Sequence, residues 1–273
     1  MGSLDYSNNR NSVGNLVMRE ARKGRGAVSN RAGRYERHAS EACDGGWGSL
    51  KEPLNKLHTV VQADHSITAI TRNISPDLGF NRSINAYRGC EHGCAYCFAR
   101  PTHTFLGLSP GQDFESRIFA KHDAPVQLAR ELSNPKYQCR MIALGTNTDP
   151  YQPTERRLEI TRSILSVLSQ YEHPVGIVTK SALVTRDIDI LESMARRNMV
   201  KMVLSLTTLD SELARRLEPR ASTPLKRLAA ISALSKAGIP TGINFAPVIP
   251  ALNESELEGT LEAASAAGAR EAG

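Results

Sequence analysis

Residues 87–98 read YRGCEHGCAYCF, a stretch that contains three closely spaced cysteines, Cys90, Cys94 and Cys97. Three and then two residues separate them, and thiolates gathered in this way bind a soft metal ion or an iron–sulfur cluster. A cubane cluster has four irons, so three cysteines leave one iron without a protein ligand and open to a small molecule. The glycines at positions 89 and 93 let the backbone wrap closely around such a cluster. The spacing therefore favours a [4Fe–4S] cluster.

A zinc site is the main alternative for the same cysteines, and His92 or His103 would then supply the fourth ligand. Structural zinc sites usually combine two close pairs of ligands, however, and the sequence has no second close pair of cysteines. A disulfide framework is disfavoured, because five cysteines is an odd number and no secretory signal precedes them.

Outward from the cysteines, short apolar runs alternate with amphipathic stretches, which is the pattern of β/α units. The pattern predicts strands at residues 82–87, 141–144, 175–178, 202–206 and 242–246. It predicts helices at residues 124–132, 158–171, 187–197, 224–236 and 254–267, with Asp123 as the cap of the first helix. Strands joined by such helices form a parallel sheet, because the crossover must be long and right-handed. The sequence therefore predicts an α/β fold, a partial barrel of parallel strands.

Three segments are expected along the 273 residues. Residues 1–60 hold ten Lys or Arg and six Asp or Glu without apolar periodicity, which predicts a flexible basic N-terminal arm. Residues 61–82 form a lead-in segment, and residues 83–273 form the barrel. Because the chain ends where a sixth strand should begin, we expect a barrel that is truncated after its fifth β/α unit and has an exposed strand edge.

The composition allows a large buried core, because 40% of the residues are hydrophobic. The net charge is +6, and the basic arm is expected to be a solvated tail, with phosphate contacts to nucleic acid as the alternative. No apolar run reaches the length of a membrane span, and the N-terminus lacks the apolar stretch of an export signal. We therefore expect a cytoplasmic protein without a membrane partner.

The cysteine spacing, with Tyr96 directly before the last cysteine, resembles the signature of the radical S-adenosylmethionine (SAM) superfamily. The resemblance implies that Cys90, Cys94 and Cys97 hold a [4Fe–4S] cluster whose open iron binds SAM. It also implies a one-electron reductant of the flavodoxin or ferredoxin type as a partner. The electron would cleave SAM and release a 5′-deoxyadenosyl radical, which abstracts hydrogen from a substrate. Members of the superfamily use a partial barrel of six units.

Polar side chains stand at the carboxyl ends of three predicted strands, where the active sites of parallel α/β barrels lie. Thr148 and Asp149 follow the second strand, Lys180 follows the third, and Ser205 belongs to the end of the fourth. We expect these side chains to converge on one mouth. SAM needs such partners, namely acceptors for its amino group, a cation for its carboxylate and hydroxyls for its ribose.

Within the superfamily, residues 83–265 resemble spore photoproduct lyase and its uncharacterised relatives, the DNA repair photolyase-like proteins. By position, Thr148, Lys180 and Ser205 match residues that hold SAM in the lyase, and Tyr96 is expected to pack on the adenine side. Residues 22–30, with residues 97–103, look like the uncharacterised branch. The likeness to the lyase rests on the cysteine loop and on residues 146–149, 178–180, Ser205, Glu218, Pro219, Pro224, Arg227, 236–238 and 246–247.

Two departures from the lyase pattern concern the return of hydrogen to the product radical. Thr146 stands where the lyase has a cysteine, and Phe98 stands where it has a tyrosine. The residues expected to generate the radical therefore match those of the lyase, whereas the residues expected to act on the substrate differ. The substrate and the catalytic residues stay unassigned, with a DNA-lyase-like reaction as one expectation. Two further hypotheses are a zinc-stabilised nucleic-acid-binding module and an inactive truncated fragment.

Overall fold

The computed structural model describes residues 22–33, 35 and 56–273. In this part of the chain the main sheet has six strands, in the order β2 (Thr71–Arg72), β3 (Arg82–Ile84), β6 (Ile142–Leu144), β7 (Val175–Thr179), β8 (Val200–Ser205) and β9 (Thr241–Asn244). Neighbouring strands from β3 to β9 are parallel, and β2 runs antiparallel to β3 at one edge. The predicted α/β fold, a partial barrel of parallel strands, is confirmed.

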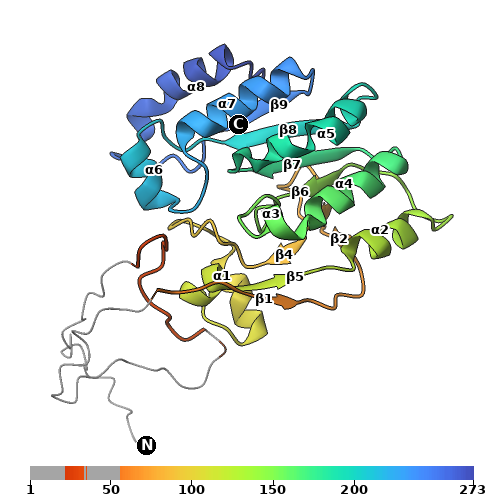
Figure 1. Cartoon of the computed structure of the whole chain (residues 1–273), viewed down its shortest axis with the longest axis horizontal. Coiled ribbons are helices and arrows are strands. Elements are labelled where there is room, and N and C mark those ends of the chain that lie inside the picture. Colours follow the sequence, from red (N-terminus) through yellow and green to blue (C-terminus); the bar gives the residue numbers. More distant parts are fainter. Residues whose placement is uncertain (1–21, 34, 36–55) are drawn as a thin grey trace, which may run out of the picture.

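Helices follow the parallel strands and cover one face of the sheet (Figure 1). They are α2 (Ala124–Leu132), α3 (Glu155–Leu158), α4 (Ile160–Gln170), the 3-10 helix η3 (Ala182–Asp187), α5 (Ile188–Ala195), α6 (Ser211–Leu217), α7 (Pro224–Lys236), the 3-10 helix η4 (Glu254–Glu256) and α8 (Leu257–Ala266). Helix α4 packs against both α2 and α5, and α7 packs against α8. Within the described ranges, every helix is too short or too polar to cross a bilayer.

The predicted helices at residues 124–132 and 224–236 coincide with α2 and α7, whereas the others differ in detail. The helix expected at residues 158–171 corresponds to α4, but it begins at Ile160. Leu158 instead ends the separate short helix α3, because Glu159 between the two has a left-handed backbone with a φ of 51°. Asp123 occupies the predicted N-cap position of α2, but its side chain accepts no hydrogen bond from the helix. The Asp123 backbone already has helical angles, φ −83° and ψ −4°, whereas a capping residue is usually extended.

A second sheet of three strands, which the sequence pattern does not predict, adjoins the barrel (Figure 1). Its central strand, β5 (Arg117–Ala120), is parallel to β1 (Val60–Ala63) and antiparallel to β4 (Tyr87–Arg88). The single strand predicted at residues 82–87 is therefore wrong, because β3 belongs to the main sheet and β4 to the small one. The cysteine loop leaves from β4 and continues into the 3-10 helix η2 (Arg100–Leu106) and α1 (Gln112–Ser116).

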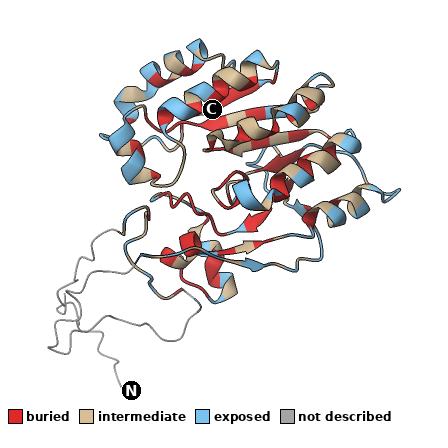
Figure 2. Cartoon of the chain, viewed as in Figure 1, coloured by how far each residue is buried: buried red, intermediate tan, exposed pale blue. Residues whose placement is uncertain are grey.

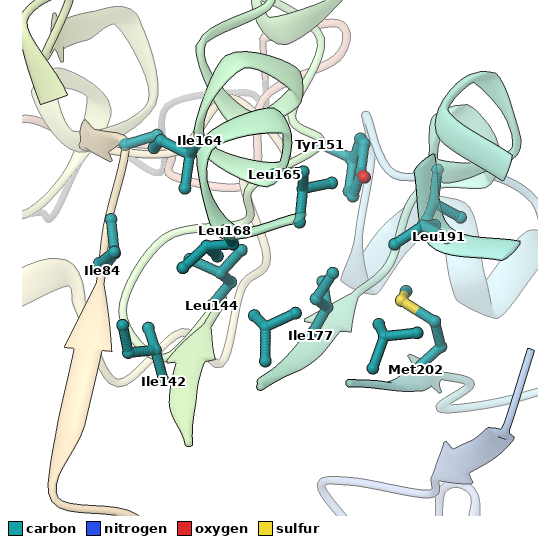
Figure 3. Packing of buried hydrophobic residues seen from close by; sticks show 14 of the residues in the cluster. Ile84, Ile142, Leu144, Tyr151, Ile164, Leu165, Leu168, Ile177, Leu191 and Met202 are labelled. Carbon is teal, nitrogen blue, oxygen red and sulfur yellow. The ribbon is translucent and has the colours of Figure 1, made fainter. Parts of the chain in front are cut away.

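The hydrophobic core fills the space between the main sheet and its helices. Figure 2 shows buried residues concentrated on the strands and on the sheet-facing sides of the helices. Figure 3 shows the side chains that meet there, among them Ile142, Leu144, Ile164, Leu165, Leu168, Ile177, Leu191 and Met202, each at most 2% exposed. Truncating one buried leucine to alanine in such a core costs about 2–5 kcal/mol. This packing fixes the strand ends relative to one another.

The outer edge of β9 is covered by the last residues of the chain. The backbone N–H groups of Ile243 and Phe245 donate to the carbonyl oxygens of Glu271 and Gly273, each at 2.9 Å. Ile243 and Ala272 form a parallel bridge. The strand edge that we expected to be exposed is therefore paired, because residues 270–273 lie where a further parallel strand would run.

Most of the predicted N-terminal arm, residues 1–21, 34 and 36–55, lies outside the described residues. Residues 22–33 are described and differ from the expected flexible segment. The Arg25 side chain is buried, and its guanidinium donates to the backbone oxygens of Glu115 at 2.6 Å and Leu57 at 2.8 Å. A buried guanidinium needs fixed acceptors for its several N–H groups, and the domain supplies them here. The Arg25 side chain therefore holds this stretch against the domain.

Candidate active site

The cysteine loop is tightly fixed between the small sheet and α1. Gly89 has a φ of 79°, and a Cβ atom there would lie 2.8 Å from the backbone oxygen of Phe114. The next residue, Cys90, donates its backbone N–H to that same oxygen at 2.9 Å. The buried side chain of Gln152 accepts from the Glu91 N–H at 2.9 Å and donates to the Gly89 oxygen at 3.2 Å. The loop backbone therefore has a defined path.

The three predicted metal ligands are free thiols, with Cys90 and Cys94 buried and Cys97 partly buried. Burial raises the pKa of Cys94 to about 12, and the neighbouring Cys97 thiol adds to the rise. Burial also raises the pKa of Cys90, to which Asp149 and Cys94 contribute. Each thiol thus lies in the electrostatic field of the next. Buried thiols that oppose one another's ionisation suit a cationic iron–sulfur group, which stabilises thiolates.

Within the described ranges, no three His, Cys, Asp or Glu side chains are gathered closely enough to hold one metal ion. Three thiols without a fourth protein ligand are the donor set of a cubane that keeps one open iron. The two expected fourth ligands of zinc also have other neighbours. His92 Nδ1 lies 3.3 Å from Asp149 Oδ2, and His103 Nε2 lies 2.9 Å from the Arg117 backbone oxygen.

Asp149 connects the cysteine loop to the ends of two strands. Its carboxylate faces His92 and accepts from the Thr179 hydroxyl at 2.7 Å and from the Lys180 N–H at 2.7 Å. The neighbouring Thr148 donates its buried hydroxyl to the Tyr87 backbone oxygen at 2.9 Å. Both residues follow β6, so the end of this strand is fastened directly to the cysteine loop.

Glu218 forms a second connection on the other side of the site. It lies one residue after α6, is buried, and pairs with the buried Arg227 of α7. The Tyr96 hydroxyl donates to Glu218, and Lys180 Nζ lies 3.4 Å from Glu218 Oε1 and 5.6 Å from the centroid of the Tyr96 ring. Ser205, also buried, accepts from Arg227 through its backbone oxygen at 2.9 Å. The role of Glu218 was not predicted, although its place in the resemblance marked the position.

The Asp149 and Glu218 connections lie on either side of the cysteine loop, so the predicted site residues lie around the three thiols. Asp149 acts on the ionisation of Cys90, and both Glu218 and Lys180 act on that of Cys94. Tyr96, Thr148, Asp149, Lys180 and Ser205 are therefore gathered with the cysteines at the carboxyl ends of β6, β7 and β8. A cavity of about 470 Å³ beside Glu218 is formed by α6 and the turn into α7 rather than by the cysteine loop.

We expect acid to destabilise the chain through the two buried carboxylates. Burial opposes ionisation, yet Arg227 and Lys180 hold the pKa of Glu218 at about 2, and His92 holds that of Asp149 at about 2. Both folded-state values lie below the ordinary values of 4.5 and 3.8. Their stabilisation is therefore present above the ordinary pKa and is lost as pH falls towards 2.

Urea denaturation of the metal-free chain at about pH 5 and about pH 3 would measure this loss. An Asp149→Asn variant should lose less stability than the wild type between the two pH values. An equal loss would show that Asp149 does not contribute. Exposed Asp77 gives a matched control, since Asp77→Asn should behave as the wild type.

The fold and the site define a parallel α/β barrel that carries three cysteine thiols at the carboxyl ends of its strands. The family model of the Radical SAM superfamily matches residues 84–264. The chain therefore belongs to the Radical SAM superfamily.

The curated relatives that match are uncharacterised proteins. One from Mycobacterium tuberculosis is 40% identical over 196 residues, which cover 70% of this chain and 58% of the relative. One from Methanocaldococcus jannaschii is 28% identical over 173 residues, which cover 63% of this chain and 62% of the relative. The chain thus spans less than two thirds of the length of these relatives.

Two similar solved structures belong to spore photoproduct lyase. A complex of that enzyme with dinucleoside spore photoproduct has a TM-score of 0.51 at 19% identity and covers 75% of this chain and 55% of the lyase. A point mutant of the lyase has a TM-score of 0.53 at 17% identity and covers 77% of this chain and 57% of the lyase. At these identities the likeness establishes the fold, and the substrate of the lyase is not transferred with it.

Proposed function

We propose that the chain is the core of a radical SAM enzyme, which binds a [4Fe–4S] cluster through Cys90, Cys94 and Cys97. The observation that carries the proposal is the position of three free, buried or partly buried thiols on one loop, which Tyr96 and Lys180 flank at the barrel mouth. When bound, such a cluster supplies one electron and an open iron to SAM, whose reductive cleavage gives a 5′-deoxyadenosyl radical for hydrogen abstraction.

The side chains around the thiols would hold SAM in place. Lys180 is the cation for its carboxylate, because an ammonium has three donors and Glu218 takes one of them. Tyr96, fixed by Glu218, presents its ring to the adenine. The hydroxyls of Thr148 and Ser205 serve the ribose and amino groups. Asp149, whose carboxylate already has several donors, orients the end of β7 and the cysteine loop.

The proposal assigns a general class of substrate and leaves the residue that returns hydrogen open. Thr146 bonds to Asn85, and Phe98 is 77% exposed. Because their side chains are a hydroxyl and a phenyl ring, neither residue offers the thiol or the phenol that would return hydrogen. A lyase acting on nucleic acid is the reaction that the overall likeness suggests, and the basic charge of the chain supports such a substrate. A flavodoxin- or ferredoxin-type protein would deliver the electron, and a reducing cytoplasm would suit the cluster.

Anaerobic reconstitution with iron and sulfide tests the proposal. About four irons and four sulfides per chain are expected, together with 5′-deoxyadenosine when SAM and dithionite are added. A chain that binds one zinc and no iron would instead support the zinc-stabilised module. A chain that binds the cluster without cleaving SAM would support the inactive form.

A further inference from the structure

The strap, which we define as residues 25–27, lies directly against the cysteine loop although it is far away in sequence. A Cβ atom on Gly26 would lie only 1.8 Å from the Gly93 backbone oxygen, so a larger residue cannot take this position without a shift of the backbone. Gly93 is equally confined, because its own Cβ would lie 2.8 Å from Glu115 Oε2 at a φ of 66°. The two glycines therefore bring the strap and the loop into backbone contact.

Glu115 of α1 joins the strap to the loop by hydrogen bonds. Its fully buried carboxylate accepts the N–H groups of Gly26 at 3.0 Å and Ala27 at 2.8 Å. It also accepts from Arg100 Nη2 at 2.6 Å. Arg100 in turn donates to the Cys94 backbone oxygen from Nε at 3.1 Å and from Nη2 at 2.8 Å. A continuous set of charge-assisted bonds thus runs from the strap to the middle cysteine.

Arg25 makes a second connection to the same loop. Besides its bonds to backbone oxygens, it donates to the Thr59 hydroxyl at 3.0 Å. Thr59 donates to Glu91 Oε1 at 2.7 Å, and Glu91 directly follows Cys90. Arg220 also pairs with Glu91 at 3.1 Å. The strap therefore supports the loop next to Cys90 as well as at Gly93 and Cys94.

We propose that Gly26 and Glu115 are positioning residues for the cluster ligands, so that the N-terminal strap is part of the cluster site. The inference rests on the proposed function. The Glu115 carboxylate accepts from the nitrogen donors of Gly26, Ala27 and Arg100, so it would act through the backbone of Gly93 and through Arg100 rather than as a ligand. Residues that orient metal ligands in this way typically change metal affinity about 10- to 100-fold when substituted.

The test compares Gly26→Ala and Glu115→Gln with matched controls in the full chain. Gly79→Ala is the first control, because a Cβ there meets no atom within 4 Å. Glu258→Gln is the second, because Glu258 is exposed on α8. The rate of iron loss from the reconstituted protein to a chelator is measured, along with the electron paramagnetic resonance spectrum of the reduced protein. Thermal unfolding of the metal-free form reports on the fold.

We expect Gly26→Ala and Glu115→Gln to lose iron at least about tenfold faster than the wild type and to change the spectrum, while both controls match the wild type. Unchanged iron loss in both variants would overturn the proposal. Unfolding of the metal-free form in both variants would also overturn it, because the strap would then support the domain as a whole. A wild type that takes up no iron would contradict the proposed function itself.

Discussion

A Cys94→Ala variant is expected to take up little iron after anaerobic reconstitution and to form no detectable 5′-deoxyadenosine. Cys94 stands between the other two ligands in sequence, and its backbone oxygen receives two bonds from Arg100. Without its thiolate the loop offers two protein ligands, and a second iron of the cubane loses its anchor. Iron and sulfide analysis beside chromatography of the nucleoside products measures both effects.

Cys139→Ala is the matched control for this experiment. Cys139 is a free thiol like Cys94, but it is exposed and precedes β6, so its loss should leave iron content and SAM cleavage as in the wild type. Equal iron content in the two variants would be incompatible with a cluster on the cysteine loop.

A Glu218→Gln variant is expected to lose both stability and SAM cleavage. The substitution leaves the buried Arg227 without its carboxylate and removes the partner of Lys180 and Tyr96. Removing one member of a buried ion pair typically costs about 3–5 kcal/mol, because the other charge stays uncompensated. Urea denaturation measures the loss of stability. The KM for SAM, from the residual cleavage, measures how far SAM binding weakens when Lys180 loses its Glu218 partner.

Glu212→Gln in the preceding helix α6 is the control, since Glu212 is exposed and should tolerate the change. If Glu218→Gln kept both the stability and the KM of this control, Glu218 would have no part in holding the SAM-binding side chains.

The main features of the barrel could be predicted because apolar strands and amphipathic helices each have a characteristic spacing of apolar residues over a short stretch of sequence. Helix α7 is an example, with Thr223 as its cap and Pro224 in its first turn. Contacts that depend on distant residues could not be predicted. The break between α3 and α4 is one case. Its residue with a left-handed backbone is Glu159 rather than the glycine by which such a conformation is usually predicted. The division of residues 82–88 between two sheets is another, since β4 pairs with the distant β5.

The candidate site likewise combines features that the sequence predicts with features that it does not. The cysteine spacing marks the loop, and the strand ends mark Thr148, Asp149, Lys180 and Ser205, because barrel topology brings such ends together. The sequence pattern gives no sign that Asp149 and Glu218 act as buried connectors, because a carboxylate after a strand or helix usually faces solvent. Their function is set by partners up to 122 residues away, such as Tyr96 for Glu218.

The contact between the strap and Glu115 has a consequence for biosynthesis. The Gly26 and Glu115 groups that bond to one another are 89 residues apart, so the ribosome must synthesise most of the first half of the domain before the strap can settle. The cysteines at positions 90, 94 and 97 emerge before Glu115 does. Until Glu115 is synthesised, the N–H groups of Gly26 and Ala27 lack their carboxylate acceptor, so the strap can be fixed on the cysteine loop only after the loop itself has been made.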